Sequence, residues 1–258
     1  MSAPGLVTER VGAVSVLRID RPEARNALDR AVIAGLAEGI VEAESSPDIR
    51  AVVLTGSGDR TFSSGLDLRE FADIGADGAG IRDAIEVFKR LQDGMVAVPL
   101  VGAANGDAVA GGMEMLLGCD VVVASERCRF GLPEVKRGLF AGGSGTTIGT
   151  RIPLAVALEI SLTGDLVDAA RAYELGLVNR VVAPDDVLDT AIGLAERIAA
   201  NGPLGVAATK ELVRLWATDP AAAVERRDHW RPLVFGSEDA REGALAFVEK
   251  RDPVWKGR

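Results

Sequence analysis

The feature that most restricts the fold is the alternation of short apolar segments with segments of helical periodicity. Each apolar segment has the length of a buried strand, and they lie at residues 13–19, 51–54, 98–102, 120–124 and 177–182. Between the first two, apolar residues recur at helical spacing from Asp29, an expected N-cap, to about Glu44. Strands that alternate with helices pair in parallel through crossover helices, so the sequence predicts an α/β fold.

The remaining elements follow from the same patterns. We expect helices at 82–93, 111–118 and 169–174, a turn at 161–164 and a mobile loop at 72–82. After residue 185 the pattern is purely helical, with Pro203 in the first turn of one helix and Ser237 as the N-cap of another. These changes divide the chain into an expected core of residues 1–195 and an expected helical region of residues 196–258, a region of the kind that commonly serves assembly.

Composition argues against several classes of protein. The formal net charge is −9, whereas nucleic-acid binding requires clustered Lys and Arg to neutralise phosphates. An anionic ligand remains compatible with this charge, because helix N-termini can hold phosphates. Cys119 and Cys128 are expected to be buried thiols, and the N-terminus lacks the pattern of a signal peptide. No apolar stretch approaches the roughly 20 residues of a membrane span, so we expect a soluble, cytoplasmic protein that does not bind membranes.

Several familiar catalytic and binding motifs are incomplete in this chain. Gly106 begins a sequence like a phosphate-binding P-loop, but Gly112 and Met113 stand where Lys and Ser or Thr are required. The segment 142–147 does not close as a dinucleotide-binding glycine fingerprint, nor as the nucleophile elbow of serine hydrolases. His229 is the only histidine, so we expect neither Ser-His-Asp catalysis nor a metal site.

Three other segments carry residues suited to acid–base chemistry. They are Phe62–Leu68, the glycine-rich stretch Asn105–Glu114, and Phe130–Glu134. Gly111 and Gly112 allow close backbone approach and present free N–H groups at an expected helix start, where negative charge is stabilised. Taken singly, Glu114 is more often an acid that complements the helix dipole, and Glu134 a solvated loop acid.

In order along the chain, these segments resemble the enoyl-CoA hydratase/isomerase (crotonase) superfamily. The resemblance covers almost the whole sequence and includes Arg21–Leu28, Phe62–Leu68, the stretch ending Gly118-Cys119-Asp120, Phe130–Glu134, and Thr163–Val178. The ending, from Glu238 to Arg258, looks like the tail of hydratase-type members. The resemblance implies the crotonase, or ClpP-like, α/β spiral of ββα units, followed by a C-terminal helical region that drives assembly into a homotrimer or a dimer of trimers.

The resemblance also implies roles for particular residues. The backbone N–H groups of Leu66 and Gly111 would form an oxyanion hole for a thioester oxygen, and no cofactor is expected because CoA enters as part of the substrate. Arg25 and Arg69 are candidates for CoA phosphates, although each is more often a solvated surface arginine. The residues implied to bind CoA and the acyl group are Ala24, Ser64, Leu66, Asp67, Leu68, Gly111, Phe247 and Lys250. The last two would complete the nucleotide site, either in the same chain or from a neighbouring subunit.

The two glutamates favour hydration over the other reactions of the family. Hydratases in this family use both acids, and Glu114 and Glu134 fall on the matching positions, Glu114 as base toward water and Glu134 as acid toward the α-carbon. Isomerases commonly retain only one, so an isomerase using Glu134 alone is the first alternative. A non-catalytic acyl-CoA-binding or assembly protein is the second alternative.

Some residues depart from the family pattern and leave the acyl group open. Leu66 stands where members often have Ala, which we expect to narrow the acyl pocket. The loop 137–143 also differs from the usual ending of this segment. Because the tail is also similar to that of carnitinyl-CoA dehydratases, a polar or branched acyl group is an alternative to a linear one.

Overall fold

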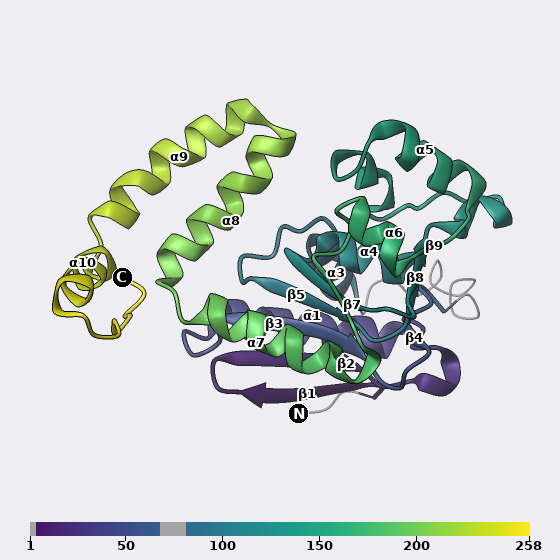
Figure 1. Cartoon of the computed structure of the whole chain (residues 1–258), viewed down its shortest axis with the longest axis horizontal. Coiled ribbons are helices and arrows are strands. Elements are labelled where there is room, and N and C mark those ends of the chain that lie inside the picture. The colour runs from purple at the N-terminus through teal and green to yellow at the C-terminus, as the bar shows by residue number, and fades with distance from the viewer. Residues whose placement is uncertain (1–3, 68–80) are drawn as a thin grey trace.

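Two β-sheets and their covering helices form the body of the chain, in a computed structural model that describes residues 4–67 and 81–258 (Figure 1). The larger sheet has the strand order β1-β2-β3-β5-β7-β10. Its strands are β1 (Leu6–Val11), β2 (Val14–Ile19), β3 (Ala51–Gly56), β5 (Leu100–Ala104), β7 (Val121–Ser125) and β10 (Arg180–Val182). The smaller sheet has the order β4-β6-β8-β9, with β4 (Thr61–Ser63), β6 (Asp107–Val109), β8 (Arg129–Gly131) and β9 (Val167–Asp168).

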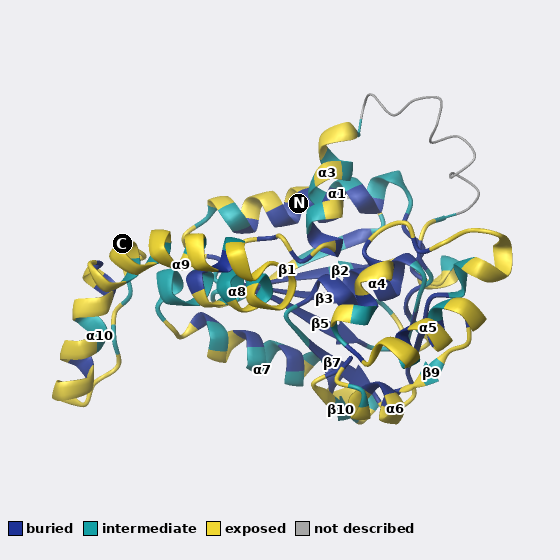
Figure 2. Cartoon of the chain, turned by 90° about the horizontal axis from the view of Figure 1, so that it is seen from above, coloured by how far each residue is buried: buried dark blue, intermediate teal, exposed yellow. Residues whose placement is uncertain are grey.

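The inner strands of the larger sheet are buried on both faces, whereas the edge strands β1 and β10 are partly exposed. The hairpin β1–β2 is antiparallel, and every other pairing in this sheet is parallel. Alternate residues of β3 point to opposite sides: Val52 and Leu54 pack with α1 (Arg30–Ser45), whereas Val53 packs with α7 (Val187–Ala199). Figure 2 shows the strands in dark blue between these two helices. Burial on both faces explains why β3, β5 and β7 read as continuous apolar runs rather than as alternating ones.

Local signals place the first helix correctly. Asp29 accepts a hydrogen bond from the backbone N–H of Val32 at 2.8 Å, as an N-cap side chain does. The expected helices at 82–93, 111–118 and 169–174 are confirmed as α3 (Arg82–Gln92), α4 (Gly111–Gly118) and α6 (Ala169–Glu174). The α/β fold class predicted from the alternation is therefore confirmed.

The expected turn at 161–164 is wrong. Residues 161–163 are the last turn of α5 (Leu154–Thr163), and Gly164 ends that helix in the left-handed conformation with φ 65°. A terminal glycine of this kind can end a helix as well as form a turn. The pattern therefore predicts the boundary of the element correctly and its type wrongly. Of the loop expected at 72–82, residues 72–80 lie outside the described residues, and Arg82 begins α3.

Three helices follow the body and extend away from it. They are α8 (Pro203–Thr218), α9 (Pro220–Phe235) and α10 (Glu238–Glu249), drawn in light green to yellow in Figure 1. Ser237 accepts from the N–H of Ala240 at 2.9 Å, which confirms the expected N-cap of α10. The division of the chain at residues 195 and 196 stays a prediction. In the part of the chain that the structure describes, no helix is long and apolar enough to cross a membrane.

Candidate active site

The smaller sheet brings the three candidate segments to one edge. Strands β4, β6 and β8 are parallel neighbours, so their carboxyl ends lie side by side. The chain leaves β4 toward Leu66, leaves β6 into the start of α4 at Gly111, and leaves β8 into a 3₁₀ turn (Pro133–Arg137) that carries Glu134. Segments separated by tens of residues in the sequence therefore meet because consecutive parallel strands end at the same edge.

Two backbone N–H groups at this edge have no acceptor among residues 4–67 and 81–258. Leu66 forms a bridge with Leu28, but the bridge uses the Leu28 N–H to the Gly65 oxygen and the Asp67 N–H to the Leu28 oxygen. The N–H of Leu66 takes part in neither bond and has no acceptor among the described residues. Gly111 is the first residue of α4, so its N–H lacks an intrahelical partner. A Cβ built on Gly111 would lie 3.6 Å from the Leu66 nitrogen, which places the two residues side by side.

A strained turn aims the start of α4 at this point. Ala110 has φ 51° and ψ −130°, a region that non-glycine residues rarely occupy. Such a residue costs about 1–3 kcal/mol and persists only when its surroundings fix it. Here its N–H donates to the Gly131 oxygen at 3.0 Å, and its oxygen accepts from the Glu114 N–H at 3.0 Å. Strand β8 and helix α4 thus both hold the turn that presents the Gly111 N–H.

Glu114 is buried and fully engaged in hydrogen bonds. The residue is 5% exposed. Oε1 accepts from the backbone N–H of Gly143 at 2.9 Å and of Gly145 at 3.0 Å, while Oε2 accepts from the Gln92 amide at 3.1 Å. Burial raises the pKa of this carboxyl above its usual value, and the donors on Gly145, Gly143 and Gln92 oppose that rise by stabilising the ionised form.

Gly143 is required for this arrangement, because a side chain there would meet the carboxylate. A Cβ would lie 2.7 Å from Glu114 Oε2 and 2.9 Å from both amide atoms of Gln92. These are the ends of side chains, so we expect Gly143→Ala to fold while displacing Glu114, and to lower kcat about 10-fold to 100-fold. Steady-state rates with a 2-enoyl-CoA thioester, the substrate class that the family resemblance implies, would measure the change in kcat.

The matched control is the neighbouring Gly142→Ala, whose Cβ would have no atom closer than 3.8 Å. We expect Gly142→Ala to keep the kcat of the unmodified enzyme. Equal kcat values for the two variants would contradict the idea that Gly143 positions Glu114.

Glu134 has a different environment from Glu114. Its Oε2 is buried and has no hydrogen-bond partner among the described residues. Burial raises the pKa of Glu134, the negative charge of Glu114 raises it further, and its own backbone N–H and Arg137 oppose the rise. Because the charge of Glu114 disfavours ionisation of Glu134, the two acids are suited to differ in protonation, with the proton on Glu134.

Comparisons with known proteins identify the family of this chain. The model of the family described as enoyl-CoA hydratase/isomerase matches residues 9–258. The chain belongs to the enoyl-CoA hydratase/isomerase family. A carnitinyl-CoA dehydratase from Salmonella enteritidis PT4 is 35% identical over 264 residues, with 96% of this chain and 97% of that protein covered.

Two solved structures are also similar to this chain. An enoyl-CoA hydratase from Mycobacterium tuberculosis H37Rv is 40% identical, with a TM-score of 0.89 over 99% of this chain and 100% of that one. A carnitinyl-CoA hydratase from Mycobacterium avium is also 40% identical, with a TM-score of 0.75 over 98% of this chain and 99% of that one. These relatives confirm the crotonase fold and membership of an enzyme family, as the sequence predicts.

Some of the residues predicted to bind CoA in this family member lie near the N–H groups of Leu66 and Gly111. The Ser64 N–H donates to the Arg25 oxygen at 3.1 Å, which places Ser64 beside the segment that contains Ala24. Asp67 lies 3.4 Å from the Arg21 guanidinium. Leu68 and Arg69 lie outside the described residues.

Phe247 and Lys250, which are also predicted to bind CoA, lie elsewhere in the chain. Phe247 is 86% exposed on α10, and Lys250 follows α10 in the left-handed conformation with φ 56°. Figure 1 shows α10 at the opposite end of the molecule from β4 and β8. A single chain therefore does not bring these two residues to Leu66 and Gly111.

Gln92, Gly143 and Gly145 were not predicted from the sequence, although they contact Glu114. The only sequence signal near the two glycines is the incomplete glycine motif at 142–147. His229, in contrast, packs edge-on against Trp230 in α9, with ring centroids 6.0 Å apart. No cluster of potential metal ligands occurs in the described ranges 4–67 and 81–258.

Proposed function

We propose that this protein adds water reversibly to a 2-enoyl-CoA thioester to give a 3-hydroxyacyl-CoA. The observation that carries the proposal is the asymmetry of two neighbouring acids. Glu114 accepts three hydrogen bonds, whereas Oε2 of Glu134 accepts none from the described residues. An ionised carboxylate needs donors and a neutral carboxyl needs fewer, so Glu114 is suited to act as base and Glu134 as acid.

The reaction follows from these roles. Glu114 takes a proton from water while the water oxygen bonds to the β-carbon, and the electron pair of the double bond moves toward the thioester oxygen. The N–H groups of Leu66 and Gly111 hold that oxygen as it gains negative charge. Glu134 then delivers its proton to the α-carbon, and the roles reverse in dehydration. Removing one donor of an oxyanion hole typically costs about 10²–10³-fold in rate, which is why two backbone donors matter here.

The nucleotide part of CoA is proposed to be held by two chains. Ala24, Ser64, Leu66 and Asp67 lie at the site edge, whereas Phe247 and Lys250 are exposed far from it in the same chain. A homotrimer, or a dimer of trimers, in which α10 of one subunit reaches the site of its neighbour would join the two groups. The many exposed apolar side chains of α8–α10 support such packing.

The surroundings of Glu134 favour an aliphatic acyl group. Leu66, Val135, Leu139 and Phe140 are 37%, 37%, 46% and 72% exposed, although each is apolar. The Leu139 N–H donates to the backbone carbonyl oxygen of Glu134 at 3.1 Å, so this loop folds back on the turn that carries the acid. Apolar side chains around a reacting centre bind hydrocarbon more strongly than a charged acyl group.

A panel of CoA thioesters tests the proposal. Short, long and branched 2-enoyl-CoA thioesters, 3-enoyl-CoA thioesters and carnitinyl-CoA would be followed by the absorbance of the conjugated thioester. We expect hydration to bleach this absorbance with linear or branched aliphatic substrates. A rise in absorbance with 3-enoyl thioesters alone would establish an isomerase instead, and binding without turnover of any thioester would establish a non-catalytic acyl-CoA-binding protein.

A further inference from the structure

Helix α4 is held at its far end by side chains from other parts of the chain. All eight of its residues, Gly111–Gly118, are buried. Its first turn carries Glu114 and the free Gly111 N–H, so the position of the whole helix fixes two parts of the site. The helix spans about 12 Å, at 1.5 Å per residue, and is too short to be stable by itself. A displacement of its last turn is therefore expected to move its first turn.

Every carbonyl of the last turn has a donor, although the helix itself supplies none. The Met115 oxygen accepts from Cys119 Sγ at 3.4 Å, and the Leu116 oxygen accepts from the Cys119 N–H at 3.1 Å. The other two receive guanidinium groups: Arg151 Nη2 donates to the Leu117 oxygen at 2.6 Å, and Arg214 Nη2 to the Gly118 oxygen at 2.7 Å. Positive charge at the carboxyl end of a helix also complements its dipole.

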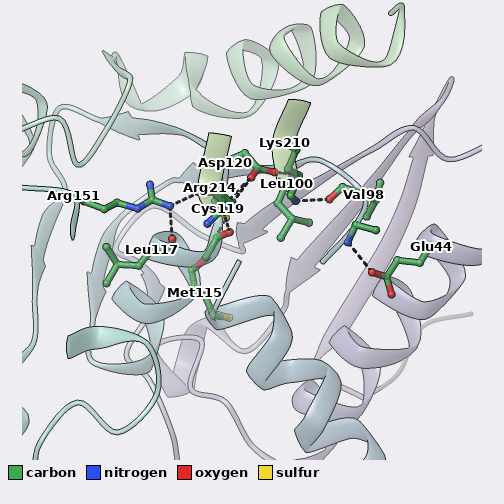
Figure 3. A network of polar contacts seen from close by, with 12 residues as sticks. Glu44, Val98, Leu100, Met115, Leu117, Cys119, Asp120, Arg151, Lys210 and Arg214 are labelled. Atoms are coloured by element: carbon green, nitrogen blue, oxygen red, sulfur yellow. Dashed lines mark hydrogen bonds and ion pairs between the residues drawn. The ribbon is translucent and has the colours of Figure 1, made fainter. Parts of the chain in front are cut away.

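The two arginines come from different elements and approach the end of α4 from different sides (Figure 3). Arg151 directly follows the 3₁₀ segment Gly145–Thr150, whose first residue donates its N–H to Glu114. Arg214 lies in α8 and reaches across to the body, where its Nε and Nη2 also bind Asp120 Oδ1 at 3.0 and 2.8 Å. Asp120 Oδ2 binds Lys210 at 2.7 Å and accepts from the Leu100 N–H at 2.8 Å. Asp120 thus anchors α8 at the point where α4 ends.

We propose that Arg214 and Arg151 are positioning residues for Glu114 and the Gly111 N–H, and that Arg214 makes this placement depend on the docking of α8. A guanidinium can bind a carboxylate and a carbonyl at once because its donors form a rigid fork. A lysine at position 214 would keep the charge against Asp120 and lose the simultaneous contact with Gly118. The inference rests on the proposed function for its kinetic consequence, but its structural part stands without turnover.

Two conservative variants test the proposal. We expect Arg214→Lys and Arg151→Lys to lower kcat about 10-fold to 100-fold, as misplacement of catalytic groups does, with the KM of the thioester changed less than 3-fold, roughly the scatter of such measurements. Hydrogen exchange followed by mass spectrometry should show faster exchange in peptides covering residues 110–118. The matched control is Arg226→Lys, because Arg226 of α9 binds Glu211 of α8 without touching α4. It should leave both readouts unchanged.

Two results would overturn the proposal. The first is normal kcat and normal exchange of residues 110–118 in both variants. The second is a lower melting temperature with unchanged kcat below it, which would reduce the arginines to a purely stabilising role. If the unmodified protein hydrates no thioester, the proposed function fails, and the exchange measurement still decides whether the arginines hold α4.

Discussion

Glu134→Gln is expected to lower kcat for hydration by about 10²–10⁴-fold, the usual contribution of a general acid. The amide keeps the size of the side chain but has no proton of suitable acidity for the α-carbon. The KM of the thioester should change little, because the proposed oxyanion hole of the Leu66 and Gly111 N–H groups is unchanged. Initial rates with a 2-enoyl-CoA thioester would measure both constants.

The pH dependence of kcat gives a second readout for Glu134. Burial and the charge of Glu114 raise its pKa, so it stays protonated to higher pH than an exposed carboxyl does. Hydration in the unmodified protein should therefore fall as the pH rises through that raised pKa. The variant should lack this alkaline limb. The exposed Glu126→Gln serves as control and should match the unmodified protein, whereas full activity in Glu134→Gln would contradict the mechanism.

Glu114→Gln should reduce kcat by a similar factor without disturbing the fold. The new amide can keep its oxygen against the N–H groups of Gly143 and Gly145, and Gln92 can turn its amide to accept from the new nitrogen. Loss of activity in this variant would then report the missing base rather than a collapsed site. A circular dichroism melt identical to that of the unmodified protein would verify this.

Asp120→Asn is expected to lower the free energy of unfolding by about 3 kcal/mol, the lower end of the cost of breaking a buried ion pair. Asp120 is the carboxylate between Lys210 and Arg214, whose side chains are 9% and 27% exposed. Burial lowers the pKa of Lys210 and the negative charge of Asp120 opposes that, so removing the charge leaves a poorly solvated cation. Arg214 keeps some access to water, which places the expected cost at the lower end.

Urea unfolding with tryptophan fluorescence would measure the effect of Asp120→Asn. All three tryptophans, Trp216, Trp230 and Trp255, lie beyond residue 203, so fluorescence reports on the helical region that Asp120 anchors. The control is Glu174→Gln, which breaks an exposed pair with Arg171 and should change stability by less than about 0.5 kcal/mol. A change as small in Asp120→Asn would show that α8 is held by other contacts.

Much of the fold could be predicted because local signals agree with burial. The cap at Asp29, the glycines that begin α4 and the serine before α10 each act within a few residues. Segment 161–164 shows the limit of this reasoning, since a helix end and a turn use the same residues. Strand β9 has only two residues and gave no pattern to detect.

The candidate site could be predicted only in part, for a physical reason. Glu114 and Glu134 stand next to glycine and proline signals that mark the ends of strands. Gln92, in contrast, is an ordinary polar residue at the end of α3, and it contacts Glu114 only because α3 and α4 end side by side. Lys210 and Arg214 are 90 and 94 residues from Asp120, and long charged side chains on a helix usually read as a solvated surface.

The contacts of Gly143 and Gly145 have a consequence for how new activities could arise in this protein. The loop that carries Leu139 and Phe140, which we propose to lie beside the acyl group, also supplies the two N–H groups on Glu114. A graft that replaces residues 138–145 to accept a different acyl chain would therefore alter the proton-accepting group together with the selectivity. Engineering, and natural divergence, should succeed more readily when substitutions are confined to 139 and 140 and both glycines are retained.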